Sequence, residues 1–223
     1  MTAHTESTDT SSRQQLLNVA ESLFLSEGVD TVSLRAIARQ AGQKNPSALH
    51  YHFGNREGLI EAIVARRFGQ QETRRAQLLD AAQQEGRLLT LREICAIQVG
   101  APFMLCREDA SFRNALGTFG FRLLLSDVNS YSAEFSQGAP SLNTLWGLGS
   151  RYLGHLSPAV LDLRIEHTHG TAMLALSRRA NARGSFRGRN ADLFFNVLVD
   201  EITAMLEAPM SESTQQYIGK REV

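Results

Sequence analysis

The stretch SLRAIARQAGQKNPSALHYHFGNRE, residues 33–57, decides the fold of the N-terminal part of the chain. Ser33 is a typical N-cap for a short helix over residues 34–40, and Ala41-Gly42 ends that helix. A second short helix is expected over residues 46–53. Two short helices joined in this way are typical of a helix-turn-helix, so the sequence predicts one here.

Helical patterns continue on both sides of this stretch. Apolar residues recur at helical spacing from about Arg13 to Ser26, and Gly28 follows as a stop signal. Asn55 is expected to cap a further helix, from Arg56 to about Glu85. The side chains that we expect in the core of this small head are those of Phe24, Leu34, Ile37 and Phe53.

The predicted helix-turn-helix carries a local positive charge. Four basic residues and no acidic residue lie between Ser33 and Arg56, whereas the whole chain has 23 basic and 23 acidic residues. Such a bounded basic face suits the phosphate backbone of a duplex, and the polar side of the second helix is expected to enter a major groove. The alternative is a plain packing module of three helices, with no nucleic acid involved. The four residues are Arg35, Arg39, Lys44 and Arg56.

Residues 15–67 resemble the N-terminal domain of the TetR family of bacterial transcription regulators. The resemblance rests on LLNVAESLFLSEGVDTVSLRAIARQAG, residues 16–42, and ALHYHFGNREGLIEAIVARR, residues 48–67. Common members have seven residues between the AG pair and the YHF triplet, and this chain has eight. The extra residue lies beside Pro46, so the helix is expected to start near Asn45. The sequence leaves open which of Gln43, Lys44, Asn45 and Ser47 reaches a base edge.

Eleven residues are candidates for DNA binding, most of them with an alternative role. Asn45 is expected either to hydrogen-bond an adenine edge or to cap the helix, and Lys44 either to hydrogen-bond a guanine edge or to remain solvated. The resemblance implies that the Tyr51 hydroxyl meets a phosphate, and its alternative is a half-buried aromatic. Ser33 is a cap first and a phosphate donor second, whereas Arg56 is expected to add charge at a helix start. The full set is Ser33, Arg35, Lys44, Asn45, Ser47, Ala48, His50, Tyr51, His52, Asn55 and Arg56.

Composition places the whole chain among ordinary globular proteins. Of its 223 residues, 43% are hydrophobic and 21% charged, which excludes a wholly disordered, collagen-like or disulfide-scaffold protein. No segment approaches the ~18 consecutive apolar residues of a membrane span. Cys95 and Cys106 are expected to be buried free thiols of a cytoplasmic protein, although one disulfide is formally conceivable.

The periodicity predicts an all-α chain of about nine helices in two domains. We expect a disordered arm over residues 1–12, a helix-turn-helix domain over 13–67, a helical body over 68–208 and a tail over 209–223. The body is expected to hold a long loop over 127–140. It shows no catalytic motif and no metal-ligand spacing, so we predict neither an enzyme nor a metal or cofactor.

The last long helix, expected over residues 190–207, is apolar on almost every side. A helix packed on one side needs a wider polar face, so the sequence predicts burial by its own core and by a second chain. Together with the helix over 158–181 it would form a four-helix bundle across a two-fold axis, and the resemblance implies the same dimer. A central core helix of a monomer is the alternative. The dimerisation candidates are Leu163, His167, Leu174, Phe194, Leu198, Ile202 and Met205.

The resemblance also implies a small-molecule pocket in the body. The candidates for its walls are Phe103, Met104, Phe119, Arg122, Trp146, Arg151 and Tyr152, with the two arginines able to meet an anionic group. The predicted function is a homodimeric repressor that binds double-stranded DNA at a palindromic operator and is released by a small hydrophobic effector. A helical protein-interaction dimer without DNA binding and a helical enzyme with an accessory head remain the alternatives.

Overall fold

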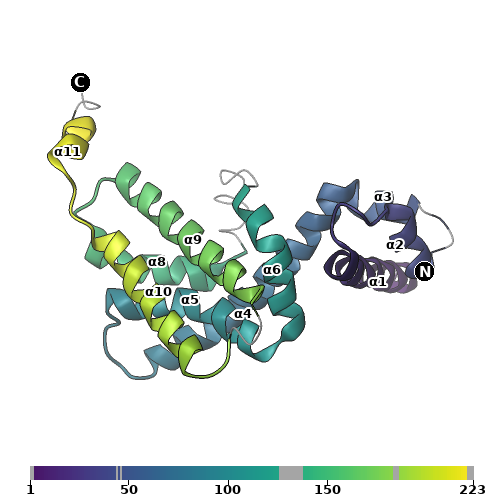
Figure 1. Cartoon of the computed structure of the whole chain (residues 1–223), viewed down its shortest axis with the longest axis horizontal. Coiled ribbons are helices and arrows are strands. Elements are labelled where there is room, and N and C mark those ends of the chain that lie inside the picture. The colour runs from purple at the N-terminus through teal and green to yellow at the C-terminus, as the bar shows by residue number, and fades with distance from the viewer. Residues whose placement is uncertain (1–2, 44, 46, 126–137, 183–185, 220–223) are drawn as a thin grey trace. The chain divides into compact units, whose positions relative to one another are not determined.

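The structure is a computed structural model that describes residues 3–43, 45, 47–125, 138–182 and 186–219 (Figure 1). Every regular element in this part of the chain is a helix, which confirms the all-α prediction, with ten helices against the expected nine. They are α1 (Ala3–Glu27), α2 (Leu34–Gln40), α3 (Ser47–Phe53), α4 (Arg56–Gln83), α5 (Leu91–Glu108), α6 (Ala110–Leu125), α8 (Pro140–Leu153), α9 (Pro158–Ala180), α10 (Arg189–Glu207) and α11 (Glu212–Gly219).

The chain divides into two compact units, an N-terminal unit of residues 1–69 and a C-terminal unit of residues 70–223. The helix α4 begins in the first unit and ends in the second. None of the described helices is both long enough and apolar enough to cross a membrane.

The first helix is longer than the sequence suggested. It begins at Ala3 rather than near Arg13, so residues 3–12, which were expected to be a disordered arm, are helical. Once a helix has nucleated on a packed segment, each added residue costs little, and residues 3–12 contain neither Gly nor Pro to stop it. At the other end of the chain, part of the expected tail forms α11.

The N-terminal unit packs around apolar side chains from α1, α2 and α4. Leu16, Phe24, Ile37 and Leu59 are almost completely buried. One charged residue, Glu21, is also buried, and its carboxylate forms ion pairs with the guanidinium groups of Arg66 and Arg67. Because both partners lie on α4, this cluster ties α1 to α4.

The C-terminal unit contains one large core between α5, α6, α8, α9 and α10. The helix α5 runs through Gly100 with Pro102 inside it. A proline lacks the N–H that would bond to the carbonyl four residues earlier, so Pro102 cannot donate to Gln98. Packing on the core maintains the helix across this defect, since Val99 and Phe103 are both buried.

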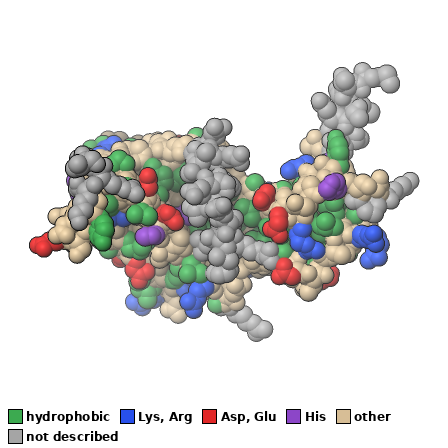
Figure 2. Space-filling model, turned by 90° about the horizontal axis from the view of Figure 1, so that it is seen from above, with side chains coloured by type: hydrophobic (Ala, Val, Ile, Leu, Met, Phe, Trp, Pro, Cys, Tyr) green, Lys and Arg blue, Asp and Glu red, His purple; other side chains and the backbone are tan. Residues whose placement is uncertain are grey.

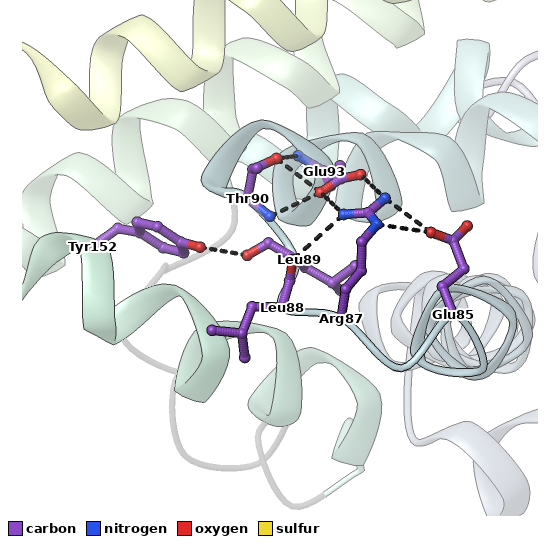
Figure 3. Close-up of polar contacts among 7 residues, drawn as sticks. All are labelled: Glu85, Arg87, Leu88, Leu89, Thr90, Glu93 and Tyr152. Atoms are coloured by element: carbon purple, nitrogen blue, oxygen red, sulfur yellow. Dashed lines mark hydrogen bonds and ion pairs between the residues drawn. The ribbon is translucent and has the colours of Figure 1, made fainter.

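The connection between α4 and α5 is fixed by a polar network (Figure 3). The Thr90 hydroxyl accepts a hydrogen bond from the Glu93 backbone N–H at 3.3 Å, and the Glu93 carboxylate accepts from the Thr90 N–H at 2.8 Å. This reciprocal pair is a capping box. The Arg87 guanidinium bridges Glu85 and Glu93, and its hydrogen bonds, together with those of Thr90, hold the pKa of Glu93 at about 2.

Two further predictions concern the body. Cys95 and Cys106 are buried free thiols, as expected, and burial raises the pKa of Cys106 to about 12. The expected long loop over residues 127–140 lies mostly outside the described residues.

Candidate nucleic-acid interface

The helix α3 exposes a polar face because its apolar residues point into the N-terminal unit. Leu49 and Phe53 are buried, one turn apart. The residues on the opposite side, Ser47, His50 and Tyr51, are therefore exposed, and Tyr51 keeps 77% of its surface open. Figure 2 shows basic side chains and a histidine on the visible surface of the N-terminal unit. Three of the DNA-binding candidates thus lie on one exposed side of α3.

Three of the polar candidates have structural duties at helix starts. The Ser33 hydroxyl accepts a hydrogen bond from the Ala36 N–H at 3.1 Å and caps α2. The side-chain oxygen of Asn45 accepts from the Ser47 N–H at 2.9 Å, and that of Asn55 accepts from the Gly58 N–H at 2.9 Å. These bonds set the ends of α2, α3 and α4. Asn45 remains exposed at the beginning of α3, where base readers lie.

The turn between α2 and α3 depends on a glycine, as the sequence predicts. Gly42 has φ of +69°, a left-handed conformation that side chains rarely adopt. A second glycine, Gly58, is required by a close approach, since a Cβ on it would lie 2.1 Å from the Phe53 carbonyl oxygen. The start of α4 can therefore pass close to the end of α3.

Arg56 has a different role from the predicted one. Its guanidinium donates to the backbone carbonyls of Val29 and Val32, at 2.5 and 2.6 Å, and lies 5.9 Å from the centre of the Phe24 ring. Both carbonyls belong to the turn between α1 and α2. Arg56 therefore holds this turn against α4, and its charge is already engaged within the protein.

Other basic side chains keep exposed positions in the N-terminal unit. Arg35 and Arg39 lie one turn apart on α2, opposite the buried Ile37 and Ala38. The sequence analysis missed Arg13, whose guanidinium lies 5.0 Å from the centre of the Phe53 ring at the end of α3. No local pattern could have indicated it, because this proximity arises only when α1 packs beside α3.

The remaining candidates are less exposed or lie outside the description. Ala48 and His52 are half-buried, and the His52 ring packs edge-on against Tyr51 with ring centres 5.0 Å apart. Lys44 lies outside the described residues.

Comparison with known proteins identifies this unit. The model of the family of bacterial regulatory proteins, tetR family, matches residues 16–63, which span the helix-turn-helix and its flanking helices. The helix-turn-helix domain of this chain belongs to the tetR family and is of the DNA-binding type. The chain is therefore a TetR-type transcriptional regulator.

The chain can also be compared with curated proteins and with solved structures. No curated protein matches the chain. A solved structure, "Crystal structure of Probable transcriptional regulatory protein RHA5900", is similar at 19% identity, covering 89% of this chain and 99% of that chain with a TM-score of 0.47.

In the body of the TetR-type regulator, most of the predicted ligand-binding residues do not line a common pocket. Phe103 and Phe119 are buried, and Phe103 packs between the rings of Phe186 and Phe195. Tyr152 donates its hydroxyl hydrogen to the Leu89 carbonyl at 2.6 Å (Figure 3), and Arg151 is exposed. Met104 packs partly buried against the core, and the side chain of Arg122 lies outside the description.

The body nevertheless contains a pocket that opens to solvent. Of the predicted residues with described side chains, Trp146 lines it. The other wall residues come from α4, α5, α8, α9 and α10 and are Gln71, Ile94, Cys95, Gln98, Val99, Pro102, Leu145, Thr168, His169, Ala172, Met173, Leu176, Ile202 and Leu206. The described residues include no cluster of three or more His, Cys, Asp or Glu positioned to hold a metal ion.

The dimerisation candidates fall into two groups. Leu163, His167 and Leu174 are exposed on one side of α9, whereas Leu198 and Ile202 are buried within the chain. Assigning these last two to a partner surface was therefore wrong, because this side of α10 packs into the core of its own chain. Phe194 and Met205 are half-buried.

A neighbouring side of α10 exposes apolar residues instead. Leu193 and Val197, which the prediction passed over, are both exposed and lie one turn apart. The polar side chains of α10 are partly engaged by α5, since Arg92 pairs with Asp200 and Arg107 with Asp192.

Proposed function

We propose that this TetR-type regulator is a homodimeric repressor that acts in the bacterial cytoplasm, binds a palindromic operator and is released by a small, mostly apolar effector. The observation that carries the proposal is the exposed face of α3, with Ser47, His50 and Tyr51 turned outward on a helix anchored by Leu49 and Phe53.

In this proposal the start of α3 enters the major groove. Ser47 and the exposed Asn45 lie at that end, and Lys44, which is outside the described residues, precedes them in the sequence. Asn and Lys are suited to the edges of adenine and guanine, respectively. Tyr51 and His50 carry donors for phosphate oxygens, and Arg35 and Arg39 on α2 supply charge to the DNA backbone.

The dimer is supported by the distribution of exposed apolar residues. Leu163 and Leu174 on α9 and Leu193 and Val197 on α10 are large apolar side chains open to solvent in the single chain. The two helices pack on each other, so their exposed residues offer a surface for a second copy. Covering such a surface is favourable, and a two-fold axis would match a palindrome.

Release by an effector is supported by the pocket in the body. The apolar walls suit a small molecule that contributes mostly hydrophobic contact. A ligand that binds more tightly to a conformation with low DNA affinity shifts the population toward that conformation.

Fluorescence anisotropy with the duplex upstream of the regulator's own gene tests the DNA-binding part. We expect tight binding that outcompetes scrambled duplex and falls steeply with salt. Tyr51→Ala should weaken binding about tenfold, the lower range of one lost specific contact. Tyr217→Ala is the matched control, because Tyr217 on α11 is equally open at 78% and should change nothing.

The outcome separates the proposal from its alternative. A helical protein-interaction dimer would show no salt-sensitive affinity for any duplex, and a genomic pull-down that recovers no DNA would establish that result. Equal losses in the two tyrosine variants would show that α3 is not the reading helix.

A further inference from the structure

The pocket in the body has walls without formal charge. Its lining residues, as the structure describes them, include no Asp, Glu, Lys or Arg. An ion that entered this pocket would lose hydration without meeting an opposite charge, which is costly. The walls therefore favour an uncharged ligand over an anion or a cation.

Charge is present behind the wall, but it is already paired. Arg75 is almost completely buried and forms an ion pair with Glu72, and the Glu72 carboxylate also accepts a hydrogen bond from the Ser141 N–H at 2.5 Å. The Glu72 carboxylate offsets the charge of Arg75, although the Nε donor of Arg75 has no hydrogen-bond partner.

One polar group on the wall lacks a partner. The side-chain oxygen of Gln98 is enclosed and receives no hydrogen bond from the protein. A buried amide that stays unpaired carries a desolvation cost. By contrast, the hydroxyl of Thr168, also on the wall, is occupied by the carbonyls of Arg164 and Ile165 on its own helix.

A second feature concentrates hydrogen-bonding capacity at the same residue. Pro102, one turn further along α5, also lines the pocket and cannot donate to the Gln98 carbonyl. Gln98 therefore offers an unpaired side-chain oxygen and a backbone carbonyl that lacks its usual helical donor. The oxygen and nitrogen of such an amide are interchangeable in assignment, and a hydroxyl group satisfies either one because it both donates and accepts.

We propose that this pocket selects an uncharged, largely apolar ligand bearing a hydroxyl group, and that Gln98 is the residue that recognises the hydroxyl. The proposal rests on the effector-release part of the proposed function and defines the chemical class of the effector. It replaces the expectation of an anionic group held by Arg122 or Arg151.

Three probes of similar shape test the ligand class: cyclohexylmethanol, ethylcyclohexane and cyclohexanecarboxylate. Trp146 is the single tryptophan of the chain and lies on the pocket wall, so its fluorescence reports occupancy directly. We expect the alcohol to bind about tenfold more tightly than the hydrocarbon, the effect of one hydrogen bond to a buried group, and the carboxylate to bind more weakly than the alcohol.

Two variants assign the hydroxyl preference to a residue. Gln98→Met keeps the length of the side chain and removes its hydrogen bonds, so the alcohol and the hydrocarbon should then bind within about twofold of each other. Met173→Leu is the control, because it changes an apolar wall residue and should preserve the tenfold ratio. Thermal melting of both variants verifies that each is folded before the titrations.

Three results would overturn the proposal: tighter binding of the carboxylate, a ratio that Gln98→Met leaves unchanged, or no fluorescence change with any of the three probes. Because the titration contains no DNA, these failures are independent of whether the duplex is bound. Failure of the anisotropy assay with unliganded protein would instead count against the proposed repressor function.

Discussion

Substitution of Arg56 tests whether this residue stabilises the N-terminal unit or contacts DNA. The sequence places Arg56 in a basic cluster, where phosphate contact is the natural interpretation. In the structure its guanidinium instead donates to the carbonyls of Val29 and Val32 and lies over the Phe24 ring. The predicted loss is therefore one of stability in the N-terminal unit, and the loss of DNA affinity follows from it.

The two hydrogen bonds determine the expected magnitude. A hydrogen bond to a charged group contributes about 1.5–3 kcal/mol, and the half-buried position of Arg56 favours the lower end. With two such bonds, Arg56→Ala should lower the free energy of unfolding of this unit by about 3 kcal/mol. Arg56→Lys keeps the charge but cannot span both carbonyls in the same geometry, so it should lose roughly half of that amount.

Two measurements on the same variants test this prediction. Hydrogen exchange followed along residues 29–42 reports the local stability, and anisotropy at several salt concentrations reports phosphate contacts. Arg35→Ala is the control, because an exposed phosphate ligand should reduce the salt slope by about one while leaving exchange unchanged. If Arg56→Ala behaved like Arg35→Ala, with unchanged protection and a smaller slope, Arg56 would be a phosphate ligand and the structural assignment would be refuted.

Three shorter predictions test other parts of the molecule. The pKa of Glu93 is lowered to about 2, so its ion pair with Arg87 stabilises the native state fully above about pH 4.5. This contribution disappears as the pH falls toward 2. Glu93→Gln should therefore flatten that part of an acid denaturation curve. The pKa of Cys106 is raised to about 12, so alkylation at pH 8 should be more than about a hundredfold slower in the native protein than in urea, and rapid native labelling would contradict its burial. Leu193→Glu should shift sedimentation from dimer to monomer, whereas Leu88→Glu, at a site 70% exposed against 62% for Leu193, should not.

The sequence predicts the helix-turn-helix of the N-terminal unit well because signals within a few residues determine where its helices begin and end. The N-caps at Ser33 and Asn55, the left-handed glycine at position 42 and the apolar spacing of Leu49 and Phe53 each act over a few residues. Such features establish which face of α3 is exposed. The role of Arg56 was not accessible in the same way, because its partners lie 24 and 27 residues earlier in the chain.

The body is harder to predict because its helices are apolar on more than one side. In α10 the periodicity indicates two apolar faces, and it does not determine which one packs on α5. The structure buries Leu198 and Ile202 and exposes Leu193 and Val197, a shift of about one position around the helix. For the same reason two aromatic residues that the sequence assigned to a ligand pocket, Phe103 and Phe119, are buried in the body instead.

The structure also shows why the pocket and the proposed dimer surface should be tested together. Ile202 and Leu206 of α10 line the pocket, while Leu193 and Val197 of the same helix are exposed for a second copy. In addition, α4 begins with Arg56 in the N-terminal unit and contributes Gln71 to the pocket wall. The helix α10 thus combines pocket residues with residues of the proposed dimer surface, and α4 combines a pocket residue with Arg56, which holds the turn between α1 and α2. A ligand that shifts either helix therefore has a physical connection to one of these regions. Measuring duplex affinity and sedimentation with and without cyclohexylmethanol would establish which of these helices transmits the effect.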